Sequence, residues 1–241
     1  MDQAWHRENA SLDEMLQAVV QAFPTLNPQE QRVAIMLYRL LAEGGPVAPS
    51  ALTQVKEWSG MPADQFLLKS NLRSLVEWDQ NETVIGFGGL TTRRSRHSLL
   101  LGERRLSTWC AWDAMFIPEL LGVTAMIESV CPQTGNPVRL RVGPDGIERM
   151  DDGTPVLSFT APSPASQVTS PDQTILSFCS YVNLFASRQA GTTWISTRPG
   201  TFLLSVADGF TLARRYNAAR YGAVLHGESS PPHGMPKSDV A

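Results

Sequence analysis

Residues 105–120, RLSTWCAWDAMFIPEL, place a cysteine and an aspartate three positions apart inside an apolar run. The pattern of the chain changes near this stretch, from helical periodicity before about residue 100 to short strand-like segments after it. A spacing of i and i+3 predicts that Cys110 and Asp113 share one helix face and lie within reach of each other. Because aspartate is seldom fully buried without a partner or a purpose, the stretch indicates chemistry as well as fold.

The N-terminal region has the apolar periodicity and the capping residues of a small helical domain. Ser11 can cap a first helix with Glu14 as its capping-box partner, and Asn27 before Pro28 can cap a second. Two shorter helices and a β-hairpin are expected next. Their expected bounds are Ser50 to near Gly60, Pro62 to about Leu75, and strands within residues 79–89 and 98–102. Together these elements predict a winged-helix-like domain over residues 1–99.

The rest of the chain has the mixed pattern of an α/β domain with antiparallel strands, predicted over residues 100–226. Short apolar segments between Gly, Pro and Asp predict strands at residues 124–130, 136–143, 155–161, 192–198 and 201–207. Helical patterns occupy residues 108–122, 172–187 with Asp172 as the cap, and 207–222. The polar, Pro-rich residues 227–241 are expected to be disordered. The fold class is therefore predicted as α+β.

Composition narrows the function without identifying it. A hydrophobic content of 42% with 18% charged residues is typical of a globular protein, and the net charge of −3 favours neither nucleic acid nor membrane as a partner. No apolar run reaches the roughly 18 residues that a membrane span needs, and the N-terminus lacks a signal-peptide h-region. Three cysteines are too few for a disulfide framework. These features predict a cytoplasmic protein with reduced thiols.

The candidate reactive residues are Cys110, Asp113 and Cys179. A free cysteine alone is most often a small buried hydrophobe, so each thiol taken singly says little. Asp113 changes this interpretation, because a carboxyl group in apolar surroundings has a raised pKa and can carry a proton near neutral pH. Trp109, Trp112 and Phe178 flank these residues and are expected either to line a substrate pocket or to pack in the core.

Three motifs that occur in register carry a resemblance to a known family. The segments WCAWDAMFIPELLG (109–122), CPQTGNPV (131–138) and SFCSYVNLFAS (177–187) resemble those of the organomercurial lyases, or alkylmercury lyases, of bacterial mercury resistance. The resemblance covers about residues 86–220, and extends more weakly over the N-terminal helices. It implies that Cys110 and Cys179 are the mercury-binding catalytic cysteines, that Asp113 is the catalytic aspartate, and that Cys131 is structural. Three positions depart from the family pattern: Ser180 stands where many members have a second cysteine, and Tyr181 and Asn183 stand where histidines occur in relatives.

The resemblance implies an enzyme that cleaves carbon–mercury bonds by protonolysis, giving a hydrocarbon and Hg(II). Thiolate is the softest ligand that a protein offers to a soft metal such as mercury, so a cysteine pair suits this chemistry. No cofactor is expected, and external thiols are expected to release Hg(II). Mercuric reductase or small cytosolic thiols are the implied acceptors.

Two other functions have some support in the sequence. A winged-helix DNA-binding regulator that responds to mercury or another metal would use residues 64–75 as its recognition helix. That segment offers only Lys69 and Arg73, with Arg93, Arg94 and Arg96 in the hairpin. A Cys–His hydrolase would need His6, His97, His226 or His233 as its base, and none has a motif-like context. The cysteines lack the CxxC spacing of a zinc site, so the lyase interpretation is favoured.

Overall fold

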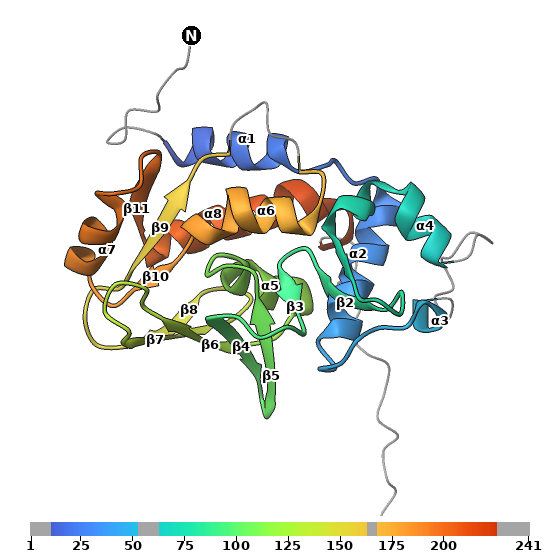
Figure 1. The fold of residues 1–241 in the computed structure, drawn as a ribbon, viewed down its shortest axis with the longest axis horizontal. Coiled ribbons are helices and arrows are strands. Elements are labelled where there is room, and N and C mark those ends of the chain that lie inside the picture. The colour runs from blue at the N-terminus through green and yellow to red at the C-terminus, as the bar shows by residue number, and fades with distance from the viewer. Residues whose placement is uncertain (1–10, 53–62, 163–167, 226–241) are drawn as a thin grey trace, which may run out of the picture.

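Helix α5 (Asp113–Leu121) lies at the centre of the structure, between a large β-sheet and the long helix α8 (Val206–Leu225) (Figure 1). The computed structural model describes residues 11–52, 63–162 and 168–225. Seven of the nine residues of α5 are buried. The sequence DAMFIPELL explains this burial, because it makes the helix apolar around most of its circumference. Gly122 ends the helix in the left-handed conformation, at φ 66°.

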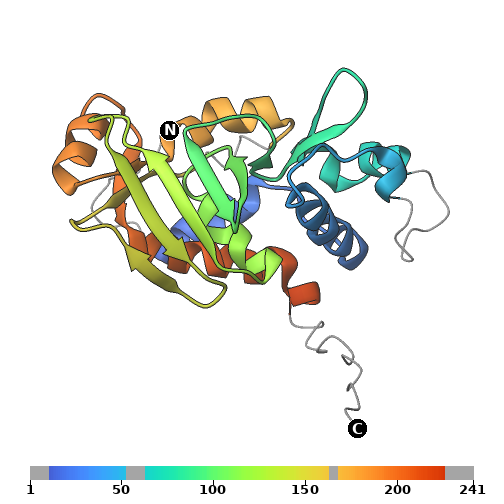
Figure 2. The same cartoon turned by 90° about the horizontal axis from the view of Figure 1, so that it is seen from below.

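The large sheet has eight strands in the order β1-β2-β3-β5-β4-β6-β7-β8, and every neighbouring pair is antiparallel (Figure 2). Buried and more exposed residues alternate along β4, β6 and β7, as expected for strands with one face against a core. The strands are β1 Val76–Trp78, β2 Val84–Phe87, β3 Leu90–Thr91, β4 His97–Leu101, β5 Arg104–Thr108, β6 Ala125–Val130, β7 Pro137–Val142 and β8 Ile147–Met150.

A second, three-stranded antiparallel sheet has the order β10-β9-β11. Helix α7 packs against all three of its strands, and α8 packs against β9 and β11. The elements of this region are β9 Val156–Thr160, α6 Pro171–Ser177, the 3₁₀ turn η2 Cys179–Tyr181, β10 Leu184–Phe185, α7 Arg188–Ile195 and β11 Thr201–Ser205.

The N-terminal helices are anchored to the rest of the molecule through α8. Both α1 and α2 contact α8, and α2 also contacts α5. Ser11 forms the predicted capping box with Glu14. Asn27 caps the second helix as predicted, and in addition forms a capping box with Glu30. The elements are α1 Leu12–Ala22, α2 Pro28–Leu41, α3 Pro49–Leu52, α4 Ala63–Lys69 and the 3₁₀ helix η1 Asn71–Leu75. Among the described residues, no helix combines the length and the apolar character that crossing a bilayer requires.

The predicted mixture of helices and antiparallel strands is confirmed, but several element assignments were wrong. The strand at residues 98–102 does not form a hairpin with β2. Its residues 98–101 lie in β4, which pairs with β5 and β6, so the sheet is continuous across residue 99. Strand β8 was not predicted, because its residues IERM alternate too little in polarity. The winged-helix-like domain and its boundary at residue 99 stay predictions, and residues 53–62 and 227–241 lie outside the described part of the chain.

The segment TTWISTR (192–198) was expected to be a strand, and most of it lies in α7 instead. Thr and Ile favour strands by local propensity, but such propensity depends strongly on context. Ser187 caps the helix by accepting a hydrogen bond from the N–H of Ala190. Ala190 and Trp194, four residues apart, are both buried, and the Trp194 ring packs on Phe185 with ring centroids 5.5 Å apart. Tertiary packing therefore determines the helix.

Candidate active site

Cys110 lies in the short connection between β5 and α5, not on the helix itself. The N–H of Ala111 donates to the carbonyl of Val182 over 3.2 Å, and the hydroxyl of Thr108 donates to the carbonyl of Cys110 over 2.7 Å. These bonds hold the chain in a non-helical path, so α5 begins only at Asp113. The predicted shared helix face is therefore wrong, but the two residues still meet, because the N–H of Cys110 donates to Oδ2 of Asp113 over 2.7 Å.

Cys179 lies at the start of the 3₁₀ turn that follows α6. The expected helix over residues 172–187 ends at Ser177, and its cap is Ser170 instead of Asp172. The chain leaves the helix because β9 binds the next segment: the hydroxyl of Ser158 donates to the carbonyl of Tyr181 over 2.7 Å, and the N–H of Asn183 donates to Ser158 Oγ over 3.0 Å. This turn, together with the connection after β5, brings Cys179 next to Cys110.

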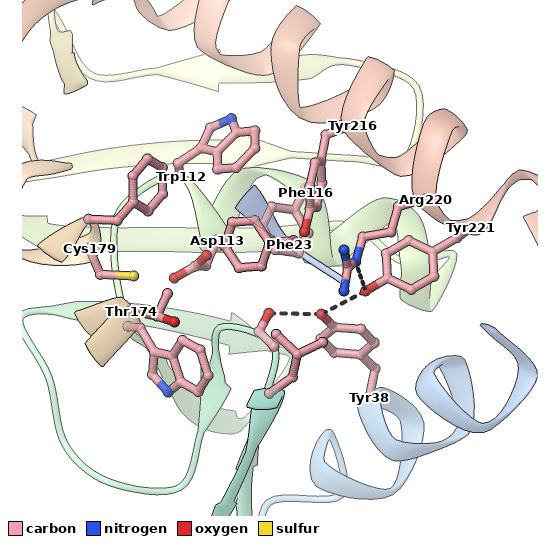
Figure 3. Close-up of a pocket in the computed structure, with 14 residues that line it drawn as sticks. Phe23, Tyr38, Trp112, Asp113, Phe116, Thr174, Cys179, Tyr216, Arg220 and Tyr221 are labelled. Atoms are coloured by element: carbon pink, nitrogen blue, oxygen red, sulfur yellow. Dashed lines mark hydrogen bonds between the residues drawn. The ribbon is translucent and has the colours of Figure 1, made fainter. Parts of the chain in front are cut away.

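The structure brings together all three candidate reactive residues. The two Sγ atoms and a carboxylate oxygen of Asp113 all lie within 4.8 Å of one another. The residues are buried, with exposed fractions of 0% for Cys110, 6% for Asp113 and 2% for Cys179. Figure 3 shows Cys179 and Asp113 facing the same cavity. Two thiols and one carboxyl group form a donor set that suits a soft metal.

Burial determines the protonation of this cluster. It raises the pKa of Asp113 to about 7, although hydrogen bonds from Cys110 act to lower it. Burial also raises the pKa of both thiols, and the nearby carboxylate of Asp113 adds to the effect. At neutral pH the two cysteines are therefore thiols, and Asp113 is divided between its protonated and ionised forms.

A narrow cavity adjoins the cluster. The space among its lining atoms is about 340 Å³ including open solvent, and only about 10 Å³ of it admits the centre of a water-sized sphere. Trp109, Trp112 and Phe178, the three aromatic residues named from the sequence, all line it. The indole N–H groups are satisfied, Trp109 by Glu77 Oε2 over 3.1 Å and Trp112 by the carbonyl of Gly209 over 3.0 Å. The rings therefore present apolar surface to the cavity.

Several lining residues have no counterpart among the sequence predictions. Tyr216, Arg220 and Tyr221 come from α8, Tyr38 from α2 and Phe23 from the connection between α1 and α2. Thr174 of α6 and Gly88 also line the cavity. One available signal is the i, i+4 pair Tyr216 and Arg220 on the helix at 207–222, where an arginine shares the buried helix face.

The other singled-out residues are not members of the cluster, although Ser180 and Tyr181 share the 3₁₀ turn of Cys179. Cys131 is buried, and its backbone closes a turn with Gly135 and Asn136. Ser180 donates to the carbonyl of Ile175 over 2.7 Å, and the side chain of Asn183 donates to the carbonyl of Ser180 over 3.1 Å. None of the departures Ser180, Tyr181 and Asn183 is among the residues that line the cavity.

His97, a candidate base of the hydrolase alternative, does not reach the thiols. It is buried on β4 and its Nδ1 lies 2.9 Å from the hydroxyl of Ser129. Burial and the charge of Arg96 lower its pKa to about 3, so the ring is neutral. His6, His226 and His233 lie outside the described residues.

A mixed α/β fold that buries two thiols beside a protonatable carboxyl group is the framework of an enzyme that handles a soft metal. The family model for alkylmercury lyase (MerB) matches residues 90–217. An alkylmercury lyase of Pseudomonas putida is 35% identical over 74% of this chain and 79% of its own length, and one of Staphylococcus epidermidis is 34% identical over 82% and 84%. The chain belongs to the alkylmercury lyase family of enzymes.

The fold itself has a solved counterpart. The crystal structure of the mercury-bound form of MerB2 superposes with a TM-score of 0.64, covering 86% of this chain and 98% of that one, at 15% sequence identity. At that identity the likeness shows a shared fold.

Gly89 is expected to be indispensable for the position of Asp113. An added Cβ at this residue would lie 2.5 Å from Asp113 Cγ, whereas one at Gly102 would meet nothing within 4 Å, and both glycines have positive φ. Gly89→Ala should therefore lower the free energy of unfolding by about 1–3 kcal/mol more than Gly102→Ala, the range for overpacking a buried site. Urea unfolding of both variants measures this, and equal losses would show that Asp113 moves aside without cost.

Asp113→Asn should change how stability depends on pH. The pKa of about 7 in the folded state lies above that of the unfolded chain, about 3.9, so the folded protein binds the extra proton between these values. The contribution of Asp113 to stability is therefore complete below about pH 4 and is lost as the pH rises through 7. The Tm of the wild type minus that of Asp113→Asn should fall by at least about 3 °C from pH 4 to pH 8.

Asp79→Asn is the matched control for this measurement. Asp79 is half-buried, and the hydrogen bonds from Thr83 and Asn81 lower the pKa of its carboxyl group. From about pH 5 upwards it is ionised in both the folded and the unfolded chain, so its Tm difference should stay flat from there to pH 8. A flat difference for Asp113→Asn as well would mean that the Asp113 carboxyl ionises normally.

Proposed function

We propose that this protein is an organomercurial lyase that cleaves the carbon–mercury bond of alkyl- and arylmercury compounds by protonolysis. One observation carries the proposal. Two buried thiols and a buried carboxyl group with a pKa of about 7 lie close enough to one another to bind the same metal ion. The family membership of the chain supports the same reaction.

The first task of the site is to convert its thiols into ligands. A cysteine binds mercury as thiolate, and coordination to a metal cation lowers the pKa of a thiol enough for its proton to leave. As R–Hg⁺ binds Sγ of one cysteine, the Asp113 carboxylate accepts the proton of one thiol. The proton of the second thiol leaves with the ligand that was bound to mercury in the free substrate. Both thiolates, from Cys110 and Cys179, then bind the same metal.

The second task is to return a proton to carbon. Two thiolates raise the electron density on mercury and make the bound carbon more basic. Protonated Asp113 donates its proton to that carbon, the electron pair of the C–Hg bond becomes the C–H bond, and Hg(II) stays on the two sulfur atoms. A carboxyl group with a pKa near 7 can both accept and return a proton at neutral pH.

The surroundings of the cluster suit this substrate class. Aromatic side chains line the cavity, and organic mercurials carry apolar groups that such a lining accommodates. We propose further that the reaction takes place in the cytoplasm without a cofactor, and that external thiols remove Hg(II). Small cytosolic thiols or a mercuric reductase are the proposed acceptors.

We propose that the N-terminal region, residues 1–99, covers the catalytic part, residues 100–226, and does not read DNA. Tyr38 of α2 lines the cavity, which supports this role. The candidate recognition helix is interrupted at Ser70, and Leu67 and Leu72 on either side of the break are buried. A helix that enters the major groove needs a continuous exposed basic face, and this segment offers only Lys69 and Arg73, on either side of the break.

Three substitutions test the mechanism in single-turnover cleavage of phenylmercury with excess thiol. Cys110→Ala and Cys179→Ala should abolish benzene release, because each leaves mercury with one thiolate. Asp113→Asn should still bind Hg²⁺ but should cleave at least about 10²-fold more slowly, the loss typical of removing a general acid–base group. In D₂O the wild-type protein should release benzene with one deuterium, at the carbon that mercury occupied.

Cys131→Ala is the control, because Cys131 is buried but lies outside the cluster. It should lower the Tm and leave the cleavage rate close to that of the wild type. A folded Asp113→Asn protein with a normal rate would remove Asp113 from the mechanism, and a normal rate for Cys179→Ala would contradict the two-thiolate step.

A further inference from the structure

Arg220 is a buried cation that lacks a carboxylate partner. Only 6% of the residue is exposed, and within residues 11–52, 63–162 and 168–225 no Asp or Glu forms an ion pair with it. Its Nη1 donates to the carbonyl of Pro24 over 2.9 Å and its Nε to the hydroxyl of Tyr221 over 3.4 Å. Its Nη2 is buried, and no described residue accepts a hydrogen bond from it. Burying a charge without an opposite charge costs free energy, so a functional role for this arginine is worth testing.

Aromatic rings surround the guanidinium and compensate part of this cost. The centroids of the Phe23, Tyr216 and Tyr221 rings lie 5.4, 5.7 and 5.8 Å from its Cζ atom. These distances are near the outer limit of a cation–π contact, so the rings leave the charge incompletely balanced. Nη2 therefore remains a strong donor with no acceptor among the described residues.

The guanidinium borders the reactive cavity at the end away from the thiols. Figure 3 shows Cys179 on one side, Asp113 and Phe116 in the middle, and Arg220 with Tyr38 and Tyr221 on the other. The Tyr38 hydroxyl donates to the carbonyl of Gly88 over 2.8 Å and lies 3.5 Å from the Tyr221 hydroxyl. This end of the cavity is therefore polar and positive, in contrast to the apolar end beside the cysteines.

The same residue also borders a second hollow. Pro24, Leu26, Tyr216 and Arg220 are among the residues that line a space between the α1–α2 connection and α8. About 50 Å³ of this hollow admits the centre of a water-sized sphere. Arg220 thus lines both the reactive cavity and this second hollow.

We propose that Arg220 is a specificity-determining residue that binds a carboxylate on the organic group of the mercurial, on the side away from the C–Hg bond. The inference rests on the proposed lyase function. Nη2 donates a charge-assisted hydrogen bond to the carboxylate, and the Tyr221 hydroxyl, which accepts from Nε, donates a second. The favoured substrates are arylmercurials with a ring carboxylate, whose apolar ring lies among the aromatic side chains while mercury reaches the cysteines.

A purely structural role for Arg220 is the alternative that the test must separate. Its bond to Pro24 links α8 to the α1–α2 connection, and losing it would loosen Phe23 over the cavity. Such loosening would slow cleavage of every substrate. Binding of a carboxylate affects only substrates that carry one.

The test compares two substrates, phenylmercury and 4-carboxyphenylmercury, each with 2-mercaptoethanol or thioglycolate as the thiol. Only 4-carboxyphenylmercury and thioglycolate carry a carboxylate, so the four combinations supply it from the substrate, the thiol, both or neither. In the wild type, the kcat/KM of the carboxylate substrate should exceed that of phenylmercury with either thiol. Arg220→Met should lower this ratio at least about 10-fold, the value of one charge-assisted hydrogen bond, mainly through KM. Arg220→Lys, which keeps the charge, should retain part of the ratio.

Arg198→Met is the matched control. Arg198 also donates to a carbonyl, that of Trp194 over 2.8 Å, and lies 3.9 Å from the centroid of that ring, but it does not line the cavity. It should leave the substrate ratio unchanged. Equal losses for both substrates in Arg220→Met, or a loss that follows the carboxylate of the thiol, would overturn the proposal.

A mercury-free measurement separates this proposal from the lyase function. Benzoate should raise the Tm of the wild type and of Arg198→Met but not of Arg220→Met, and benzamide should raise none of them, since only a ligand that binds the folded state stabilises it. A failure of the wild type to cleave phenylmercury would contradict the lyase function, while the benzoate result would still decide on the carboxylate site. Equal Tm shifts with benzoate in the wild type and Arg220→Met would overturn the proposed carboxylate site.

Discussion

The hydrogen bond from the Cys110 N–H to the Asp113 carboxyl group, formed in a place without solvent, is the interaction on which the rest of the site depends. It turns the first residue of α5 back towards the loop before the helix. The carboxyl group is thereby fixed next to both sulfur atoms. Burial then sets its pKa near 7, because removing water disfavours the charged form more than the bond to Cys110 favours it.

The fold maintains this geometry from three directions. Gly89 leaves room for the carboxyl group on the sheet side, and its carbonyl accepts a hydrogen bond from the N–H of Trp109 over 2.8 Å. From α8, the carbonyl of Gly209 accepts the indole N–H of Trp112. Glu77, which also pairs with Arg93, holds the indole of Trp109 in place. Elements distant in sequence thus determine how one short loop is oriented.

The sequence predicted which residues lie together at the candidate site better than it predicted their backbone. Residue types and motif order identified Cys110, Asp113 and Cys179, which lie together, and local capping rules identified α1 and α2. The same rules failed around the two cysteines, because hydrogen bonds to Val182 and Ser158 replace the helical bonds that periodicity suggests. Tyr38 could not be found from local patterns, since the packing of α2 against α8 and α5 brings it to the cavity. For Arg220, the i, i+4 spacing from Tyr216 indicates a shared helix face but not the cavity beside it.

The separation of Arg220 from Asp113 has its own physical logic. A guanidinium in contact with the carboxyl group would stabilise its charged form and lower its pKa, so that at neutral pH the group would lose the proton that the proposed mechanism delivers to carbon. In the structure, both groups act on the Tyr216 hydroxyl. The charge of Arg220 acts to lower the pKa of this hydroxyl and the charge of Asp113 to raise it, while burial has the largest effect and raises it. An aromatic layer between cation and acid therefore lets one cavity hold a transferable proton at one end and a positive charge at the other.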